Sequence, residues 1–105
     1  MRLETLKNID FNRVIKEGKC LKTRFCIICY LEGEQRKFGF TVKKKIKCNP
    51  LRNRIKRRIR EIIRLNMESI PVGWWVFIGL EEAKDMDFKE MQRVMMDSLK
   101  KLAKS

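Results

Sequence analysis

Residues 49–64 place large apolar side chains at helical spacing inside the most basic part of the chain. The apolar series consists of Leu51, Ile55, Ile59, Ile62 and Ile63. A helix with this spacing carries its apolar side chains on one side and its charges on the other. Asn49 is expected to cap this helix and Pro50 to occupy its first position. The sequence therefore predicts an amphipathic helix whose apolar side is buried in a core.

The basic side of this predicted helix belongs to a longer run of positive charge. Residues 43–60 hold ten Lys or Arg residues and no acidic residue. We expect Asn53, Lys56, Arg57, Arg60 and Arg64 on the outer side, with Arg52, Arg54 and Arg58 at the flanks. Because the apolar side anchors the helix, this charge lies on a folded surface and not in a disordered tail.

The other segments predict an α+β fold of order α-β-β-α-β-α, with a central sheet and helices. A first helix is expected from Asn8 to Gly18, and a last helix after a capping box formed by Asp87 and Glu90. Residues 24–31 and 36–42 alternate like strands and flank a polar turn, which predicts two antiparallel strands. Residues 74–80 form a buried strand pattern. One core of this kind makes residues 1–105 a single domain.

The overall charge indicates a nucleic-acid partner. The chain of 105 residues has a formal net charge of +13 and a pI near 10.0, with 44% hydrophobic residues. Such an electrostatic excess is typical of proteins that bind nucleic acids. No apolar run is long enough to cross a membrane. Binding to a membrane surface is disfavoured because the apolar side of the basic helix is needed for the core.

The cysteine and histidine content limits metal binding and catalysis. With no secretion signal, we expect four free thiols (Cys20, Cys26, Cys29 and Cys48) and a cytoplasmic location. Cys26 and Cys29 would lie on opposite faces of a strand, so no protein-bound metal is expected. The absence of histidine excludes His-based acid-base chemistry, and there is no Gly-rich phosphate loop. No catalytic residue is expected in this chain.

The segment FGFTVKKKIKCNPLRNRIKRRIRE resembles the central signature of the protein component of bacterial ribonuclease P. The matching elements are a strand that ends in Val42, the pair Lys44-Lys45, and the helical block that begins with Arg52-Asn53-Arg54. Lys56-Arg57 and Arg60-Glu61 complete the block. The first helix matches through Phe11, Val14 and Gly18, so the resemblance covers essentially the whole chain.

The resemblance implies a binding role in a ribonucleoprotein endonuclease. In this family the RNA subunit, with bound Mg²⁺, hydrolyses the phosphodiester, and the protein helps it remove the 5′ leader of precursor tRNA. No obligate protein partner is implied. The resemblance implies that the RNA subunit is contacted by Lys44, Lys45, Arg52, Asn53, Arg54, Lys56, Arg57 and Arg60.

The resemblance also implies that the single-stranded leader lies between the first helix and one face of the sheet. Mapped onto this sequence, that cleft is expected to contain Phe11, Ile15, Cys26, Ile28, Tyr30 and Thr41. Two departures from the family pattern are Ile15, where an aromatic residue is common, and the bulkier connection Lys47-Cys48-Asn49-Pro50.

Two other functions compete with this interpretation. A structural RNA-binding protein of ribosomal type explains the charge and the amphipathic helix, but not the Arg-Asn-Arg block beside a strand-borne Lys-Lys pair. A DNA-binding helix-turn-helix is disfavoured because the basic helix follows strands, and no preceding helix is placed to cross the DNA backbone.

Overall fold

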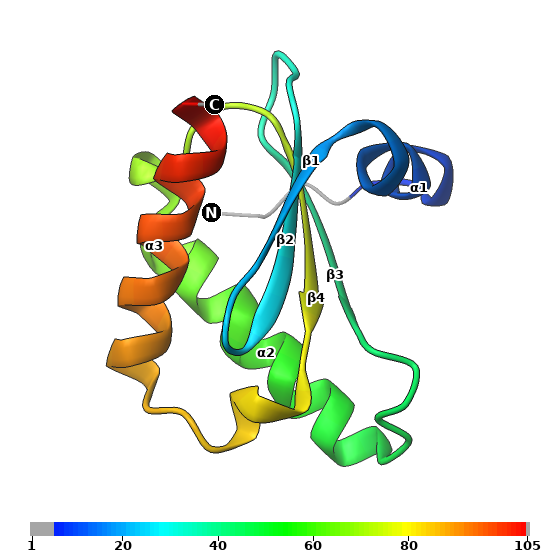
Figure 1. Cartoon of the computed structure of the whole chain (residues 1–105), viewed down its shortest axis with the longest axis vertical. Coiled ribbons are helices and arrows are strands. Elements are labelled where there is room, and N and C mark those ends of the chain that lie inside the picture. The colour runs from blue at the N-terminus through cyan, green and yellow to red at the C-terminus, as the bar shows by residue number, and fades with distance from the viewer. Residues whose placement is uncertain (1–5, 105) are drawn as a thin grey trace.

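The computed structural model describes residues 6–104 and forms a four-stranded sheet with helices on both faces (Figure 1). Two short 3₁₀ helices, η1 (Met67–Ser69) and η2 (Glu81–Lys84), flank the last strand. The longer elements are α1 (Asn8–Glu17), β1 (Lys19–Lys22), β2 (Cys26–Leu31), β3 (Lys37–Val42), α2 (Asn49–Leu65), β4 (Trp74–Gly79) and α3 (Phe88–Lys104).

The strands are ordered β1-β2-β4-β3 across the sheet. β1 pairs with β2 and β2 pairs with β4 in antiparallel fashion, whereas β3 and β4 are parallel. Parallel neighbours need a long crossover connection, and α2 provides it. This arrangement confirms the predicted α+β fold with a central sheet.

The structure adds two features that the sequence patterns did not predict. β1 is a fourth strand, and β2 and β3, although they run in opposite directions, are separated by β4. β1 was not predicted because it is short and mostly exposed, so its residues show no clear alternation between buried and exposed positions. The turn at residues 32–35 does not join a hairpin because α2 returns the chain to insert β4 between the two strands.

The helix boundaries agree with the predicted ones to within one residue. α1 and α2 begin at Asn8 and Asn49, so the cap positions are Lys7 and Cys48 and not the two asparagines. Gly18 ends α1 as expected, and its N–H donates to the Val14 carbonyl at 2.9 Å.

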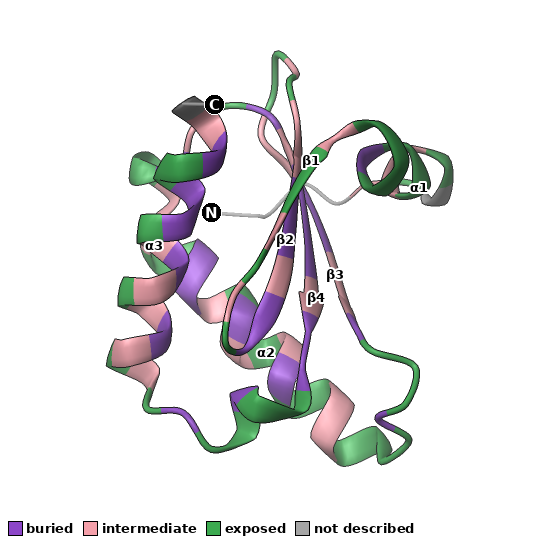
Figure 2. Ribbon diagram, viewed as in Figure 1, coloured by how far each residue is buried: buried purple, intermediate pink, exposed green. Residues whose placement is uncertain are grey.

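The main core lies between the sheet and the two long helices α2 and α3 (Figure 2). The apolar side of α2 is buried as predicted, except for the half-buried Leu51. Stacked rings continue across the sheet from Trp75 through Phe77 to Phe40, with centroids 6.5 and 5.6 Å apart. Burial of the apolar side chains in this core supplies most of the driving force for folding. The stripe of α3 in this core comprises Phe88, Met91, Met95, Leu99 and Leu102.

A smaller apolar cluster lies on the opposite face of the sheet, beneath α1. Val14, Cys29 and Val76 are its buried members, and Phe11 packs against them. A side chain at Gly39 would collide with the Phe11 ring, because a Cβ there would lie 2.5 Å from Phe11 Cδ2. Gly39 therefore allows Phe11 to lie close against β3.

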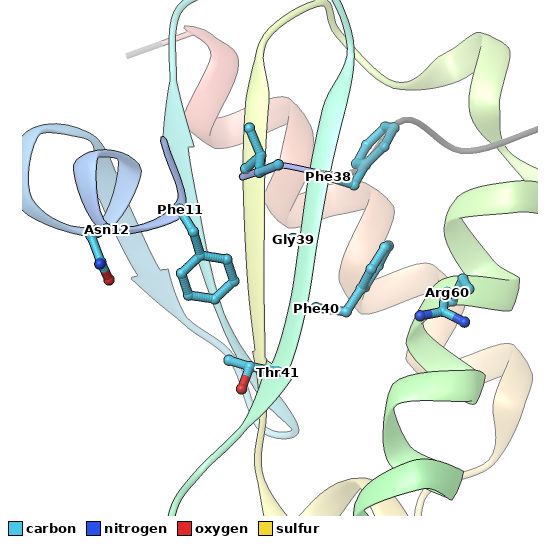
Figure 3. Close-up of a pocket in the computed structure, with 8 residues that line it drawn as sticks. Phe11, Asn12, Phe38, Gly39, Phe40, Thr41 and Arg60 are labelled. Atoms are coloured by element: carbon cyan, nitrogen blue, oxygen red, sulfur yellow. The ribbon is translucent and has the colours of Figure 1, made fainter. Parts of the chain in front are cut away.

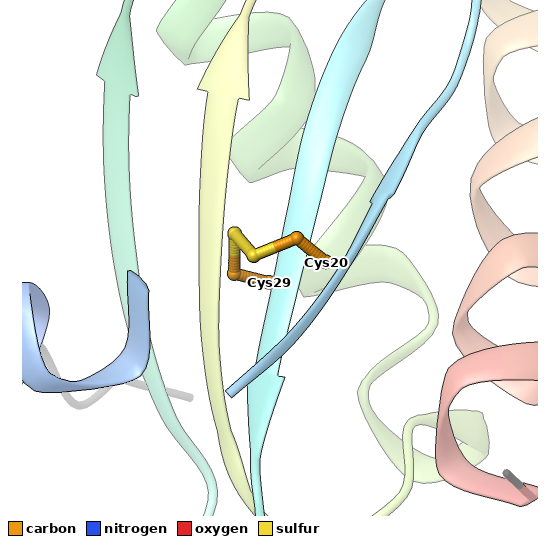
Figure 4. Close-up of a disulfide and its surroundings, with 2 residues drawn as sticks. All are labelled: Cys20 and Cys29. Carbon is orange, nitrogen blue, oxygen red and sulfur yellow. A yellow bond between two sulfur atoms is a disulfide. The ribbon is translucent and has the colours of Figure 1, made fainter. Parts of the chain in front are cut away.

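Two of the four cysteines form a disulfide, so the expectation of four free thiols is wrong. Cys20 on β1 lies directly opposite Cys29 on β2, and a disulfide joins them (Figure 4). Opposed residues of an antiparallel pair point to the same face, which brings the two sulfur atoms together. The pairing could not be foreseen without β1. Cys26 and Cys48 are free, the first buried and the second exposed.

The two free thiols should differ strongly in reactivity. Burial raises the pKa of the Cys26 thiol to about 12, partly opposed by a hydrogen bond with Thr23. At pH 8 Cys26 therefore stays protonated, and the thiolate is the reactive form. We expect a thiol reagent to modify one cysteine rapidly in the native, unreduced protein, and Cys48→Ser to abolish that reaction. A second rapidly reacting thiol before reduction would contradict the disulfide, because Cys20 is exposed and would then be free.

Candidate RNA interface

The exposed side of α2 carries a row of basic side chains. Asn53, Arg57, Arg60 and Arg64 follow one another at helical spacing and are all exposed, and Arg54 is exposed beside them. Arg64 is paired with Glu61. Within the described part of the chain, Arg54 and Arg57 form no ion pair, so their guanidinium groups are available to an anionic partner. Planar guanidinium groups suit bidentate contacts to phosphates.

The first turn of α2 adds to this positive field. It contains no acidic residue, so nothing there offsets the positive end of the helix dipole. Lys47 is exposed just before the helix, and Lys44 and Lys45 are exposed in the preceding turn. The basic surface therefore continues from the side of α2 around its N-terminal end.

Two arginines of the basic run donate hydrogen bonds to backbone carbonyls of the protein itself. Arg58 Nη1 donates to the Ala83 carbonyl at 2.8 Å, and its Nη2 donates to the Met86 carbonyl at 2.7 Å. Arg52 Nη1 donates to the carbonyls of Lys43 and Ile46 at 3.1 and 2.7 Å. The family resemblance predicted that Arg52 contacts RNA. Its side chain is half-buried, and its hydrogen bonds hold the turn that carries Lys44 and Lys45. Lys56 is also half-buried.

A groove of about 570 Å³ runs along the edge strand β3, between α1 and α2 (Figure 3). We call it the β3-edge groove. Phe11 and Asn12 border it from α1, and Arg60 borders it from α2. The Arg60 guanidinium lies 5.4 Å from the centre of the Phe40 ring, a cation–π contact. The remaining lining residues are Leu6, Phe38, Gly39, Phe40 and Thr41.

The structure brings only some of the residues predicted for the leader cleft together. Phe11 and Thr41 line the β3-edge groove, whereas Ile15 is 38% exposed on α1 and does not. The placement of Cys26, Ile28 and Tyr30 beside α1 is wrong, because all three lie on the sheet face that packs against the main core.

Cys26 and Ile28 are fully buried in that core. Tyr30 packs on Trp75 with ring centroids 4.4 Å apart, and its hydroxyl donates to the Val72 carbonyl at 3.0 Å. The pKa of the Tyr30 hydroxyl is raised by burial and by the nearby Glu32 carboxylate.

The residues of β2 that do face α1 are Ile27, Cys29 and Leu31. Strand alternation separates these two sets correctly but cannot tell which set faces α1. The register settles it, since Cys29 is opposite Val76 and Val76 is opposite Gly39.

Sequence reasoning also missed Asn12 and Phe40 as groove residues. Phe40 has the alternation of a core residue and does pack against the core, but its position on an edge strand leaves one side open. Asn12 follows Phe11 on α1, and its polarity was the available signal.

Two further features of the described residues bear on the partner. Within residues 6–104, no three His, Cys, Asp or Glu side chains gather closely enough to hold a metal ion. No helix of that part is long and apolar enough to span a bilayer.

The sequence model of the family described as "Ribonuclease P" matches residues 2–103 of this chain. The chain belongs to the ribonuclease P protein family. It is 34% identical over 99 residues to the "Ribonuclease P protein component" of Alkaliphilus oremlandii, covering 91% of this chain and 87% of that protein. A homologue from Pelotomaculum thermopropionicum with the same name is 32% identical over 98 residues, covering 90% of this chain and 88% of that protein.

Solved ribonuclease P proteins share the fold. The Staphylococcus aureus protein superposes with a TM-score of 0.80 at 29% identity, covering 98% of this chain and 97% of that one. The Thermotoga maritima protein gives a TM-score of 0.81 at 31% identity, with 93% and 96% coverage. Membership of the ribonuclease P family favours a role in tRNA processing over the ribosomal alternative.

Proposed function

We propose that this chain is the protein subunit of a ribonuclease P ribonucleoprotein, which removes the 5′ leader from precursor tRNA in the cytoplasm. Its partners are the ribonuclease P RNA and the precursor tRNA. The RNA subunit supplies the hydrolysis, with Mg²⁺ bound to that RNA. The protein's own contribution is to bind and position RNA.

The observation that carries this proposal is the position of Arg60. It lies on the basic side of α2 and also borders the β3-edge groove. A folded RNA held against α2 would therefore lie next to any strand held in the groove. Phosphate contacts on α2 supply affinity without reading sequence, so the chain can bring the RNA subunit and the leader together at one junction.

The β3-edge groove has the chemistry to hold an unpaired RNA strand. Phe11 offers a ring for base stacking, Arg60 offers a phosphate contact, and Asn12 and Thr41 offer hydrogen bonds. We assign the leader to this groove. We assign the RNA subunit to Lys44, Lys45, Asn53, Arg54 and Arg57, with Arg60 shared between both ligands and Arg52 and Lys56 supporting the same surface.

A cleavage assay tests the function directly. The purified chain is added to a bacterial ribonuclease P RNA and a 5′-extended tRNA, at low Mg²⁺ where the RNA alone is slow. We expect correct 5′ maturation that depends on the protein, because its cations replace part of the Mg²⁺ that screens RNA phosphates. Binding of the RNA without any change in cleavage would support the structural RNA-binding alternative instead.

A further inference from the structure

A second groove, rich in lysine, lies where two turns meet at one end of the sheet. It has a volume of about 390 Å³, and we call it the hairpin groove. The turn between β1 and β2 forms one wall, and the segment that follows β3 forms the other. Its lining residues are Lys22, Thr23, Arg24, Lys43, Lys45, Leu80 and Glu82.

The wall from the β1–β2 turn is held in place by hydrogen bonds. Thr23 Oγ1 donates to the Cys26 carbonyl at 2.8 Å and accepts the Cys26 N–H at 3.1 Å. The Phe25 carbonyl accepts the Leu80 N–H at 2.8 Å, which ties the turn to the end of β4. The backbone beside Lys22 is therefore fixed before any ligand arrives.

The opposite wall is held at the same end of β4. The Lys43 N–H donates to the Gly79 carbonyl at 3.0 Å, and the Ile46 N–H donates to the Lys43 carbonyl at 3.1 Å. Arg52 reinforces this turn through its bonds to the carbonyls of Lys43 and Ile46. Lys43 and Lys45 are thereby presented toward the groove on a rigid turn, which reduces the entropy lost on binding.

The lining of the hairpin groove is strongly positive. Its described residues include four basic side chains and one carboxylate, Glu82. Arg24 is partly compensated by an ion pair with Glu90 at 2.8 Å. Among the residues that the structure describes, Lys22, Lys43 and Lys45 form no ion pair. The local excess of positive charge therefore favours the binding of an anion.

We propose that the hairpin groove is a phosphate-binding site for the backbone of the RNA subunit, separate from the basic side of α2. The inference rests on the proposed function. No aromatic side chain lines the groove within residues 6–104, so its chemistry suits phosphates and not stacked bases. Its Lys43–Lys45 wall leads directly into the N-terminal end of α2, so an RNA bound on α2 would continue into the groove.

The test compares three single variants in binding to a bacterial ribonuclease P RNA over a range of KCl concentrations. Lys22→Gln should weaken binding and reduce the slope of log K against log[KCl] by about 1, as expected for one lost phosphate contact. Glu82→Gln should tighten binding, since it removes the one carboxylate among the described residues of the lining. Lys100→Gln, an exposed lysine on α3 outside the groove, should leave both quantities unchanged.

A second arm separates the two RNA ligands. Precursor tRNA is bound to the preassembled holoenzyme, where Lys22→Gln should have no effect. An effect on precursor binding alone would assign the groove to the substrate and overturn the proposal. Equal slopes for Lys22→Gln and Lys100→Gln would also overturn it, while leaving protein-dependent cleavage intact. Loss of cleavage stimulation by the unmodified chain would instead refute the proposed function.

Discussion

Replacing Arg58 with methionine should lower the free energy of unfolding by about 3 kcal/mol. The guanidinium donates to the Ala83 and Met86 carbonyls, and hydrogen bonds that involve a charged group contribute roughly 1.5–3 kcal/mol each. Methionine keeps the apolar stem but leaves both carbonyls without this donor. Urea denaturation of the purified chain, with the midpoint and slope compared with those of the unmodified protein, measures the change.

Arg57→Met is the matched control for Arg58→Met. Arg57 is the preceding residue on the same helix, but it is exposed and makes no ion pair within the described residues. Its replacement should change the free energy of unfolding by less than about 0.5 kcal/mol, while it should reduce the salt dependence of RNA binding. Equal stability losses in the two variants would show that the contacts of Arg58 with the segment after β4 contribute nothing.

Replacing Phe11 with alanine should weaken binding of precursor tRNA by the holoenzyme while leaving mature tRNA unaffected. Stacking of a base on an aromatic ring contributes about 1–3 kcal/mol, which corresponds to a loss of roughly 5- to 150-fold. Mature tRNA has no leader and cannot use the ring. Equilibrium binding of both tRNAs to the assembled holoenzyme gives the ratio directly.

The apolar contacts of Phe11 require a separate control. Phe11 also packs in the small cluster with Val14 and Cys29, so its removal should cost some stability. Ile9→Ala truncates an apolar side chain of the same helix that is 81% exposed and outside the groove lining. It should change neither tRNA affinity. If Phe11→Ala weakened the two tRNAs equally, the ring would serve packing and not leader binding.

The sequence predicted most of the helices and the basic surface because these depend on local periodicity. On α2 the spacing of Ile55, Ile59 and Ile62 predicts which side of the helix is buried. The arginines between them are then expected on the opposite side and its flanks. In contrast, β1 was missed because its exposed residues carry no such repeat. The pairing of Cys20 with Cys29 was missed for the same reason.

The predicted leader cleft shows the limit of periodicity most clearly. Alternation along β2 separates Cys26 and Ile28 from Ile27 and Cys29 but cannot tell which set faces α1, and the mapping from the family resemblance placed the wrong set there. The insertion of β4 between β2 and β3 decides which residues share a face, and that is a long-range contact. The individual roles of Arg52 and Arg58 likewise depend on backbone carbonyls supplied by distant segments.

Local patterns in the sequence were therefore enough to predict a small α+β domain that presents a basic helix of the ribonuclease P type. They could do so because a helix carries its amphipathic pattern within a few turns of chain. Tertiary structure alone decided which sheet face lies under α1, which arginines remain available to RNA, and where the β3-edge groove and the hairpin groove lie. Each of these depends on strand order and on contacts between segments far apart in the chain, which no local pattern records.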